Sequence, residues 1–202
     1  LTHSKFKRAI FSRLAIATVV YALFAAPAYA ADLTGTLKKI KDSGSISLGH
    51  RESSIPFSYY DDKQQVIGYS QEIMLKAADA IKAELNLPNL QVKLVPVTSQ
   101  NRIPLLQNGT IDMECGSTTN NTERQKQVSF SNTIFIIGTR LLTKKDSGVK
   151  DFADLAGKNV GVLAGTTTEA RLDALLKQSQ LSARVTRLNE GGEGIAMAIE
   201  RA

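Results

Sequence analysis

Hydrophobic and polar positions alternate along this chain in blocks, and the period of the alternation changes several times. Apolar residues recur at every second position in 45–50, 90–97 and 111–115, which is the period of a strand with one buried face. Between the first two blocks, 71–85 has the spacing of an amphipathic helix, with one apolar face made by Ile73, Met74, Ala77, Ala78 and Ile81. Such alternation of strands and helices predicts an α/β fold with parallel sheets.

The same reasoning predicts the remaining elements. Helices are expected at 36–42, from about 101 to 107, at 169–178 and from 193 onward, with a helical turn at 151–155. Strands are expected at 66–67, 133–143, 159–163 and 184–188, and an edge strand or extended loop at 55–60. A further helix is predicted to begin at Thr122, with Gln125 completing a capping box, and a second capping box is predicted from Thr166 to Glu169.

The first 30 residues have the pattern of a secretory signal peptide. Four basic residues precede the apolar run 14–26, and Ala28-Tyr29-Ala30 fits a cleavage site. The run is shorter than the roughly 20 residues that span a bilayer as a helix, so a cleaved signal is favoured over a membrane anchor. We therefore expect export to the periplasm.

Charge and cysteine content narrow the possible functions. The formal net charge of +6 includes four charges of the signal segment and would fall to +2 after its removal, so the basic balance does not indicate nucleic-acid binding. The single cysteine, Cys115, lies in an alternating strand and is interpreted as a small apolar residue rather than a nucleophile. The two histidines, His3 and His50, give no metal-ligand spacing, and we expect neither a metal nor a cofactor.

Polar, hydroxyl-rich turns follow several of the predicted strands. They cover 51–54, 99–102, 116–124 and 165–168, and three of them carry an arginine: Arg51, Arg102 and Arg124. Ligands of open α/β sheets bind beyond the carboxyl ends of the strands, where free backbone N–H groups also favour anions. If the turns converge, the arginines predict a site for a ligand with two carboxylates. The alternative is that each arginine is separately exposed to solvent.

Motifs for catalysis are not evident in the sequence. The turn at 165–168 has no lysine after its glycine and is not a phosphate-binding loop, and no nucleophile elbow is present. The sequence thus offers groups that capture a ligand but no group that would attack one.

Three segments carry a resemblance to a known family: HRESSIPFSYYD, VTSQNRIPLLQNGTIDMECGSTTNNTERQKQVSFS and IFIIGTRLLTKK. They resemble the bacterial extracellular solute-binding proteins of family 3, and within it the glutamate/aspartate binders of ABC importers. DFADLAGKNVGVLAGTTTE resembles the opening of the family's second lobe. The resemblance covers about 36–202 and implies a type II periplasmic binding protein-like α/β fold with two lobes and a hinge.

The resemblance also implies domains, a ligand and site residues. Residues 31–140 would form lobe 1 and 141–202 part of lobe 2, with the crossing at about 138–145. The ligand would be glutamate or aspartate, passed to the permease subunits of an ABC transporter by a protein that we expect to be a monomer. Arg51, Ser99 and Arg102 would hold the side-chain carboxylate. The α-carboxylate would be held by Arg124, Thr119 and Thr167, and Ser117 would help to receive the α-ammonium.

Two departures from the family pattern stand out. Asn189-Glu190-Gly191 replaces a family segment with a histidine at the cleft, so Glu190 would either repel an acidic ligand or point away from it. The family's second-lobe aspartate, its return crossing and its C-terminal helices would follow Ala202, so we expect a C-terminally truncated sequence. The alternatives are the sensor domain of a receptor, or a dehydratase-like enzyme using Glu52, Glu114 or Glu190 as acid or base.

Overall fold

The computed structural model describes residues 33–193 and 195, and the predicted signal segment lies outside them. The described strands form three small sheets. The first is parallel, with the order β5 (Gln91–Pro96), β1 (Ser45–His50) and β6 (Met113–Glu114). The second is antiparallel and contains β2 (Ser53–Ser54), β3 (Ser58–Tyr60) and β4 (Val66–Ile67). The third pairs β7 (Asn159–Leu163) with β8 (Arg184–Leu188) in parallel.

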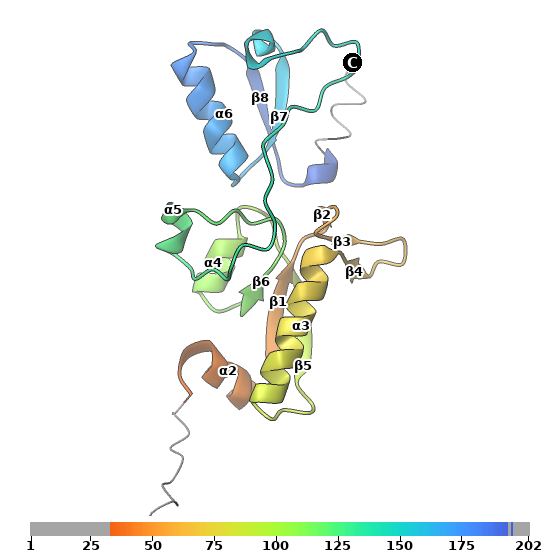
Figure 1. Ribbon diagram of the computed structural model, residues 1–202, viewed down its shortest axis with the longest axis vertical. Helices are drawn as coiled ribbons and strands as arrows, with labels where there is room; N and C mark the ends of the chain where they lie inside the picture. The colour runs from red at the N-terminus through yellow and green to blue at the C-terminus, as the bar shows by residue number, and fades with distance from the viewer. Residues whose placement is uncertain (1–32, 194, 196–202) are drawn as a thin grey trace, which may run out of the picture. The chain divides into compact units, whose positions relative to one another are not determined.

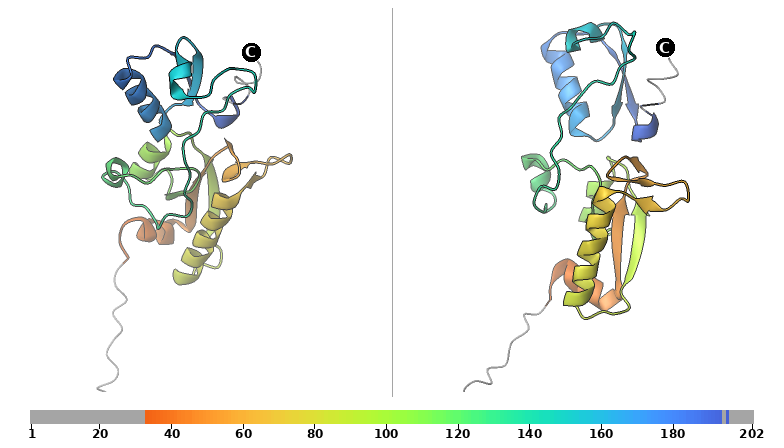
Figure 2. Two further views of the ribbon diagram at one scale, coloured as in Figure 1. Left: turned by 45° about the horizontal axis from the view of Figure 1, so that its top comes forward. Right: turned by 45° about the vertical axis from the view of Figure 1, so that its right-hand side comes forward.

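Helices cover the two parallel sheets. Among the described residues, α2 (Gly35–Ser43) precedes β1, α3 (Tyr69–Glu84) connects β4 with β5, and α4 (Arg102–Gln107) connects β5 with β6. The short helix α5 (Thr122–Gln125), the 3-10 helix η1 (Phe152–Leu155) and α6 (Thr167–Gln178) follow. Figure 1 shows α3 lying along β1 and α6 lying beside β7 and β8, and both views of Figure 2 agree. The predicted α/β class is therefore confirmed.

The core of the first sheet is organised around its central strand, β1. Ile46 and Leu48 are completely buried, and apolar residues of neighbouring helices and loops are buried as well: Ile40, Met74, Ala78, Val97 and Ile111. The edge strand β5 differs, because Val92 and Leu94 remain 43% and 42% exposed although they pair in register with Ile46 and Leu48. Apolar side chains of the central strand β1 are thus buried, whereas those at the paired positions of the edge strand β5 stay partly exposed.

A side-chain carboxylate fixes β6 beside β1. The Asp112 carboxylate accepts hydrogen bonds from the backbone N–H of Ser47 at 2.8 Å and from Nζ of Lys39 at 2.8 Å. The N–H of Asp112 donates to the carbonyl of Ser47 at 2.8 Å. Because the aspartate side chain replaces a backbone partner, β6 is two residues long instead of the predicted 111–115.

The second parallel sheet has a separate, smaller core. Its buried residues are Leu155, Val160, Val162 and Leu172, contributed by η1, β7 and α6. The predicted strands 159–163 and 184–188 are confirmed at both ends.

The prediction of a strand at 133–143 is wrong. The segment has no regular structure, and its apolar side chains are exposed, with Ile136 at 88% and Ile137 at 70%. A high strand propensity needs a neighbouring strand to pair with, and no described strand lies beside this one. Its first residues are held by other contacts, since Phe135 packs edge-on against Phe57 at 5.0 Å and the carbonyl of Ile134 accepts a hydrogen bond from the Tyr69 hydroxyl.

The predicted cap of α5 is also wrong by one residue. Asn121, rather than Thr122, is the N-cap, and its side-chain oxygen accepts a hydrogen bond from the N–H of Arg124 at 2.9 Å. Asparagine is preferred over threonine at the N-cap position, so Asn121 caps the helix and Thr122 becomes its first residue. The prediction at Thr166 is half right: Thr166 accepts from the N–H of Glu169, but the Glu169 carboxylate accepts from Gly165 instead of Thr166.

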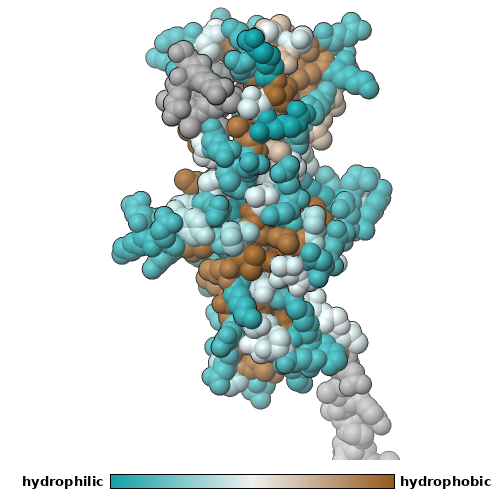
Figure 3. Space-filling model, turned by 180° about the vertical axis from the view of Figure 1, so that it is seen from behind, coloured by the Kyte–Doolittle hydropathy of each residue, from teal (hydrophilic) through white to brown (hydrophobic). Residues whose placement is uncertain are grey.

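Hydrophobic side chains also gather in patches on the face shown in Figure 3. The exposed apolar residues of the described part include Val92 and Leu94 of β5 and several from 134–142. No described helix is long and apolar enough to cross a membrane.

Leu48 and Leu94 provide a matched test of this packing, since they are the same residue type at paired positions. Leu48→Ala should lower the free energy of unfolding by about 2–5 kcal/mol, because it leaves a cavity in a closed core. Leu94→Ala should cost about 1 kcal/mol or less, because the side chain is already partly in water. Urea unfolding of both variants checks the difference, and equal costs would contradict the assignment of β1 as the packed centre.

Candidate functional site

The carboxyl ends of β5, β1 and β6 lie at one edge of the first sheet, because all three strands are parallel. Arg51 follows β1 directly, Ser99 and Arg102 follow β5, and the turn 116–119 follows β6. The structure therefore places these strand-end turns together at one edge of the first sheet. The alternative of separately exposed arginines is wrong for Arg51 and Arg102, which are 0% and 1% exposed.

Arg51 is held from several directions. Its backbone N–H donates to the Ser58 hydroxyl at 2.9 Å, and its Nη1 donates to the Ser99 hydroxyl at 2.9 Å. Gly116 leaves room for its side chain, since a Cβ at that position would lie 2.7 Å from Cγ of Arg51 and 2.9 Å from a carboxylate oxygen of Glu114. Any larger residue at 116 would therefore displace the arginine or the glutamate.

Arg102 is buried with little compensation. Its Nη1 lies 4.0 Å from the Glu114 carboxylate, and both Nε and Nη1 have no hydrogen-bond partner among the described residues. Burial lowers the pKa of Arg102 to about 10; Glu114 opposes this shift, while the charges of Arg124 and Arg51 add to it. At neutral pH the guanidinium thus stays charged but lacks the partners that a buried charge normally has.

The guanidinium of Arg124 binds the backbone of two turns, the one after β6 and the one after β7. Its Nη1 donates to the carbonyl of Thr119 at 3.0 Å, and its Nη2 donates to the carbonyl of Gly165 at 3.1 Å. Burial lowers the pKa of its guanidinium, and Glu114 opposes this. Gly165 requires a left-handed backbone, with φ of +72°, and a Cβ there would lie 2.9 Å from the backbone of Gln100. The turn after β7 thus closely approaches the turn after β5.

The predicted hydroxyl residues take different positions. Ser99 is buried against Arg51, and the hydroxyls of Thr119 and Thr167 lie 3.4 Å apart. Ser117 has an exposed side chain beside them in the sequence. The structure therefore brings Arg51 together with Ser99, and Arg124 together with Thr119 and Thr167.

Sequence reasoning missed the partners of these groups. Glu114 accepts a hydrogen bond from the Thr118 hydroxyl at 2.6 Å, and the Ser70 hydroxyl donates to the carbonyl of Gly116 at 2.8 Å. Glu114 occupies a polar position of the alternating segment 111–115, as Asp112 does, so local pattern did not indicate that its side chain is buried at the site. Ser70 gave no local signal, because its contact joins the first turn of α3 to a loop 46 residues away.

Glu190 lies at the site and does not point away. Its carboxylate accepts from Nη2 of Arg51 at 2.8 Å and from the Ser53 hydroxyl at 2.7 Å. With three arginines and with Glu114 and Glu190, the site keeps one net positive charge. The arrangement can therefore bind an anion.

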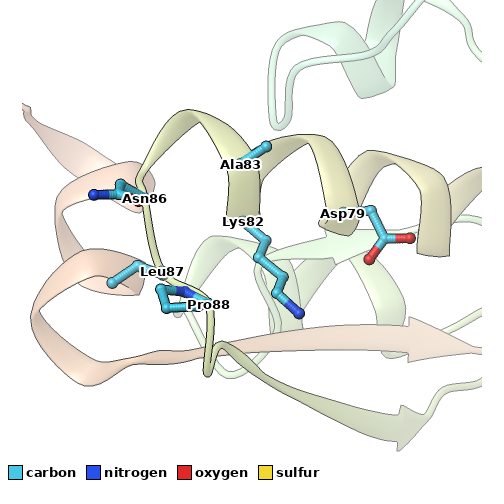
Figure 4. A pocket seen from close by; sticks show the side chains of 6 residues that line it. All are labelled: Asp79, Lys82, Ala83, Asn86, Leu87 and Pro88. Carbon is cyan, nitrogen blue, oxygen red and sulfur yellow. The ribbon is translucent and has the colours of Figure 1, made fainter.

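Other features of the described part offer no competing chemistry. Burial raises the pKa of the half-buried Cys115 thiol, which disfavours a nucleophilic thiolate. No described group of three or more His, Cys, Asp or Glu residues could hold a metal ion. Figure 4 shows a shallow hollow at the end of α3, lined by Asp79, Lys82, Ala83, Asn86, Leu87 and Pro88, and none of the predicted site residues lines it.

Comparison with known proteins identifies the family. The family model described as bacterial extracellular solute-binding proteins, family 3, matches residues 46–191, which include all seven predicted site residues. The chain belongs to this family. The resemblance inferred from the sequence motifs is thus confirmed.

Relatives within family 3 agree with this assignment. The chain is 54% identical over 185 residues to a glutamate/aspartate import solute-binding protein of Salmonella typhimurium, covering 90% of this chain and 61% of the relative. It is 55% identical over 180 residues to an L-glutamate/L-aspartate-binding protein of Pseudomonas aeruginosa, covering 89% and 60%. The chain thus spans about three fifths of these relatives' length. Both are named as binding proteins, which agrees with the expectation that this is not an enzyme.

Solved structures of amino-acid-binding proteins share the fold. An ancestral amino acid-binding protein, a precursor of cyclohexadienyl dehydratase, matches with a TM-score of 0.69 and 30% identity, covering 83% of this chain and 71% of that one. ArgBP from T. maritima, as a mutant, matches with a TM-score of 0.70 and 26% identity, covering 83% and 69%. The predicted type II periplasmic binding protein-like fold is therefore confirmed.

The Arg102–Glu114 pair should lower the stability of the solute-free protein. Replacing both residues, by Arg102→Met with Glu114→Gln, should raise the free energy of unfolding by about 1–4 kcal/mol, since a buried, incompletely bonded ion pair is replaced by neutral groups. Chemical unfolding without solute measures the change.

The matched control is the exposed pair of Lys38 and Asp42 on α2, whose atoms lie 2.7 Å apart. Lys38→Met with Asp42→Asn should change stability by about 0–1 kcal/mol. A clear loss of stability in the Arg102 double variant would show that the buried pair stabilises the fold on its own.

Proposed function

We propose that this chain is part of a periplasmic solute-binding subunit of an ABC importer, which binds glutamate or aspartate and delivers it to the membrane permease. The observation that carries the proposal is Arg102, a buried cation with Nε and Nη1 unpaired among the described residues. A carboxylate from a solute would supply the missing partner. The names of the two relatives support the choice of glutamate and aspartate.

Each site residue has a role in this proposal. Arg51, Ser99 and Arg102, grouped at the ends of β1 and β5, would hold the side-chain carboxylate. The α-carboxylate would lie near Arg124, Thr119 and Thr167, since Arg124 and Thr167 both contact Thr119. Ser117 would help to receive the α-ammonium.

Binding would be coupled to closure of two lobes, formed by residues 31–140 and 141–202. A solute that contacts groups of both lobes only in the closed form shifts the population toward that form. The bond from Arg124 to Gly165 and the contact between Thr119 and Thr167 join groups of the two proposed lobes and support this coupling. The closed form would then be the one that docks on the permease.

Calorimetric titration of the full-length mature protein with glutamate, aspartate, glutamine and arginine tests the proposal. We expect heat of binding with glutamate or aspartate. Arg102→Ala should weaken this binding by about 2–5 kcal/mol, or about 30- to 5,000-fold in Kd, because a buried charge loses its partner.

Arg184→Ala is the matched control, since Arg184 is exposed and contacts Asn159 and Gly157 at the opposite, amino end of the β7–β8 sheet. It should leave the affinity unchanged. Binding of arginine or glutamine without any binding of glutamate or aspartate would refute the proposed ligand.

A further inference from the structure

Glu190 presents a carboxylate to the site in the way that a bound solute would. One oxygen accepts from Nη2 of Arg51 at 2.8 Å, and the other accepts from the Ser53 hydroxyl at 2.7 Å. The Arg51 side chain is fully buried and that of Glu190 is 17% exposed, so the pair is largely shielded from water. Hydrogen bonds to charged groups in such surroundings are stronger than surface ion pairs.

The contact joins distant parts of the chain. Glu190 follows the carboxyl end of β8 and is 139 residues from Arg51. The backbone N–H groups of Asn189 and Glu190 both donate to the carboxylate of Glu193, at 2.9 and 3.5 Å, which holds this turn in shape. Glu190 is therefore presented by an organised turn and not by a loose side chain.

The three arginines of the site are not equally available. Arg124 donates to two backbone carbonyls, and Arg51 already has a carboxylate, whereas Nε and Nη1 of Arg102 have no partner among the described residues. If the second carboxylate of a solute binds near Arg51, it lies close to the Glu190 carboxylate, which already pairs with the same guanidinium. Two carboxylates that share one guanidinium repel each other strongly in a partly buried site.

We propose that Glu190 is a specificity-determining residue that acts as an internal carboxylate ligand of Arg51 and Ser53, which an acidic solute must displace. It lowers the affinity for amino acids with a side-chain carboxylate relative to those with a side-chain amide. In the absence of solute, it ties the turn after β8 to the segment after β1. The part that concerns solutes rests on the proposed function, and the part that concerns the solute-free protein does not.

Comparison of glutamate with glutamine isolates the effect of the second carboxylate. Titration of full-length wild type and Glu190→Gln with both amino acids gives the ratio of their Kd values. Glu190→Gln should shift this ratio toward glutamate by about tenfold or more, because the competing charge is gone. Ser53→Ala removes one of the two bonds to Glu190 and should shift the ratio in the same direction by less.

Glu123→Gln is the matched control for charge. Glu123 is exposed and its side chain pairs with Lys126 on α5, so its removal takes away one negative charge without touching Glu190. It should leave the ratio unchanged. A ratio that stays within about twofold in Glu190→Gln, or that moves toward glutamine, overturns the role in specificity.

A disulfide trap tests the internal contact without any solute. A Cβ at Gly192 would lie 4.0 Å from Cβ of Ser53, within the separation of about 3.5–4.5 Å found in disulfides. Ser53→Cys with Gly192→Cys, in a Cys115→Ser background, should therefore cross-link in solute-free, full-length protein under mild oxidation. Adding Glu190→Gln should slow the cross-linking severalfold, because a neutral amide oxygen accepts from Arg51 less strongly than a carboxylate does.

The two experiments separate the two proposals. If wild type binds neither amino acid, the proposed function fails, and the trap still decides whether Glu190 ties the two segments. Equal cross-linking rates with and without Glu190→Gln overturn the internal contact, whatever the protein binds.

Discussion

The need to neutralise buried guanidinium groups dominates this structure. Arg51 and Arg102 are among the largest fully buried side chains, and a buried cation is costly unless it is paired and hydrogen-bonded. Arg51 meets this need in part, through Ser99 and Glu190, while its Nε has no partner among the described residues. Arg102 meets it less well, since its nearest carboxylate oxygen, Oε1 of Glu114, lies 4.0 Å away at the outer limit of an ion pair. A fold that keeps such a charge buried has a place prepared for an anion, and this constraint explains the arrangement of the surrounding loops.

The scaffold serves this purpose through its topology. The parallel strands β5, β1 and β6 have their carboxyl ends at one edge, so the turns that follow these three neighbouring strands lie close together. The short β6 is held by the Asp112 side chain, and the turn after it is fixed by the Ser70 hydroxyl. Gly116 then allows Arg51 to pass beneath that turn. Each of these contacts is modest, but together they leave the arginines little freedom to turn toward solvent.

The sequence allowed prediction of those features that depend on local pattern. The period of the apolar residues located β1, β5, β7, β8 and α3, and parallel topology then placed Arg51 and Arg102 at one edge. The same reasoning failed for 133–143, because strand propensity is realised only when a partner strand is present. It also failed for the contact of Glu190 with Arg51, because a pairing across 139 residues leaves no trace in local pattern. From its charge alone, Glu190 could face the site or point away from it. Its contacts with Arg51 and Ser53 show that it faces the site.

Glu190 changes the electrostatic balance of the site as well as its occupancy. Three arginines alone would favour any strongly anionic ligand, with little discrimination between one carboxylate and two. With Glu114 and Glu190 present, the net charge is one positive unit, which equals in magnitude the net charge of an acidic amino acid. The overall field thus attracts such a solute, whereas the local contact at Arg51 opposes its second carboxylate. The long-range attraction raises the rate at which the solute encounters the site. The short-range competition with Glu190 shortens the lifetime of the complex. Such a site would combine a fast encounter with an acidic solute and a shorter lifetime of the complex, both of which the proposed function can use.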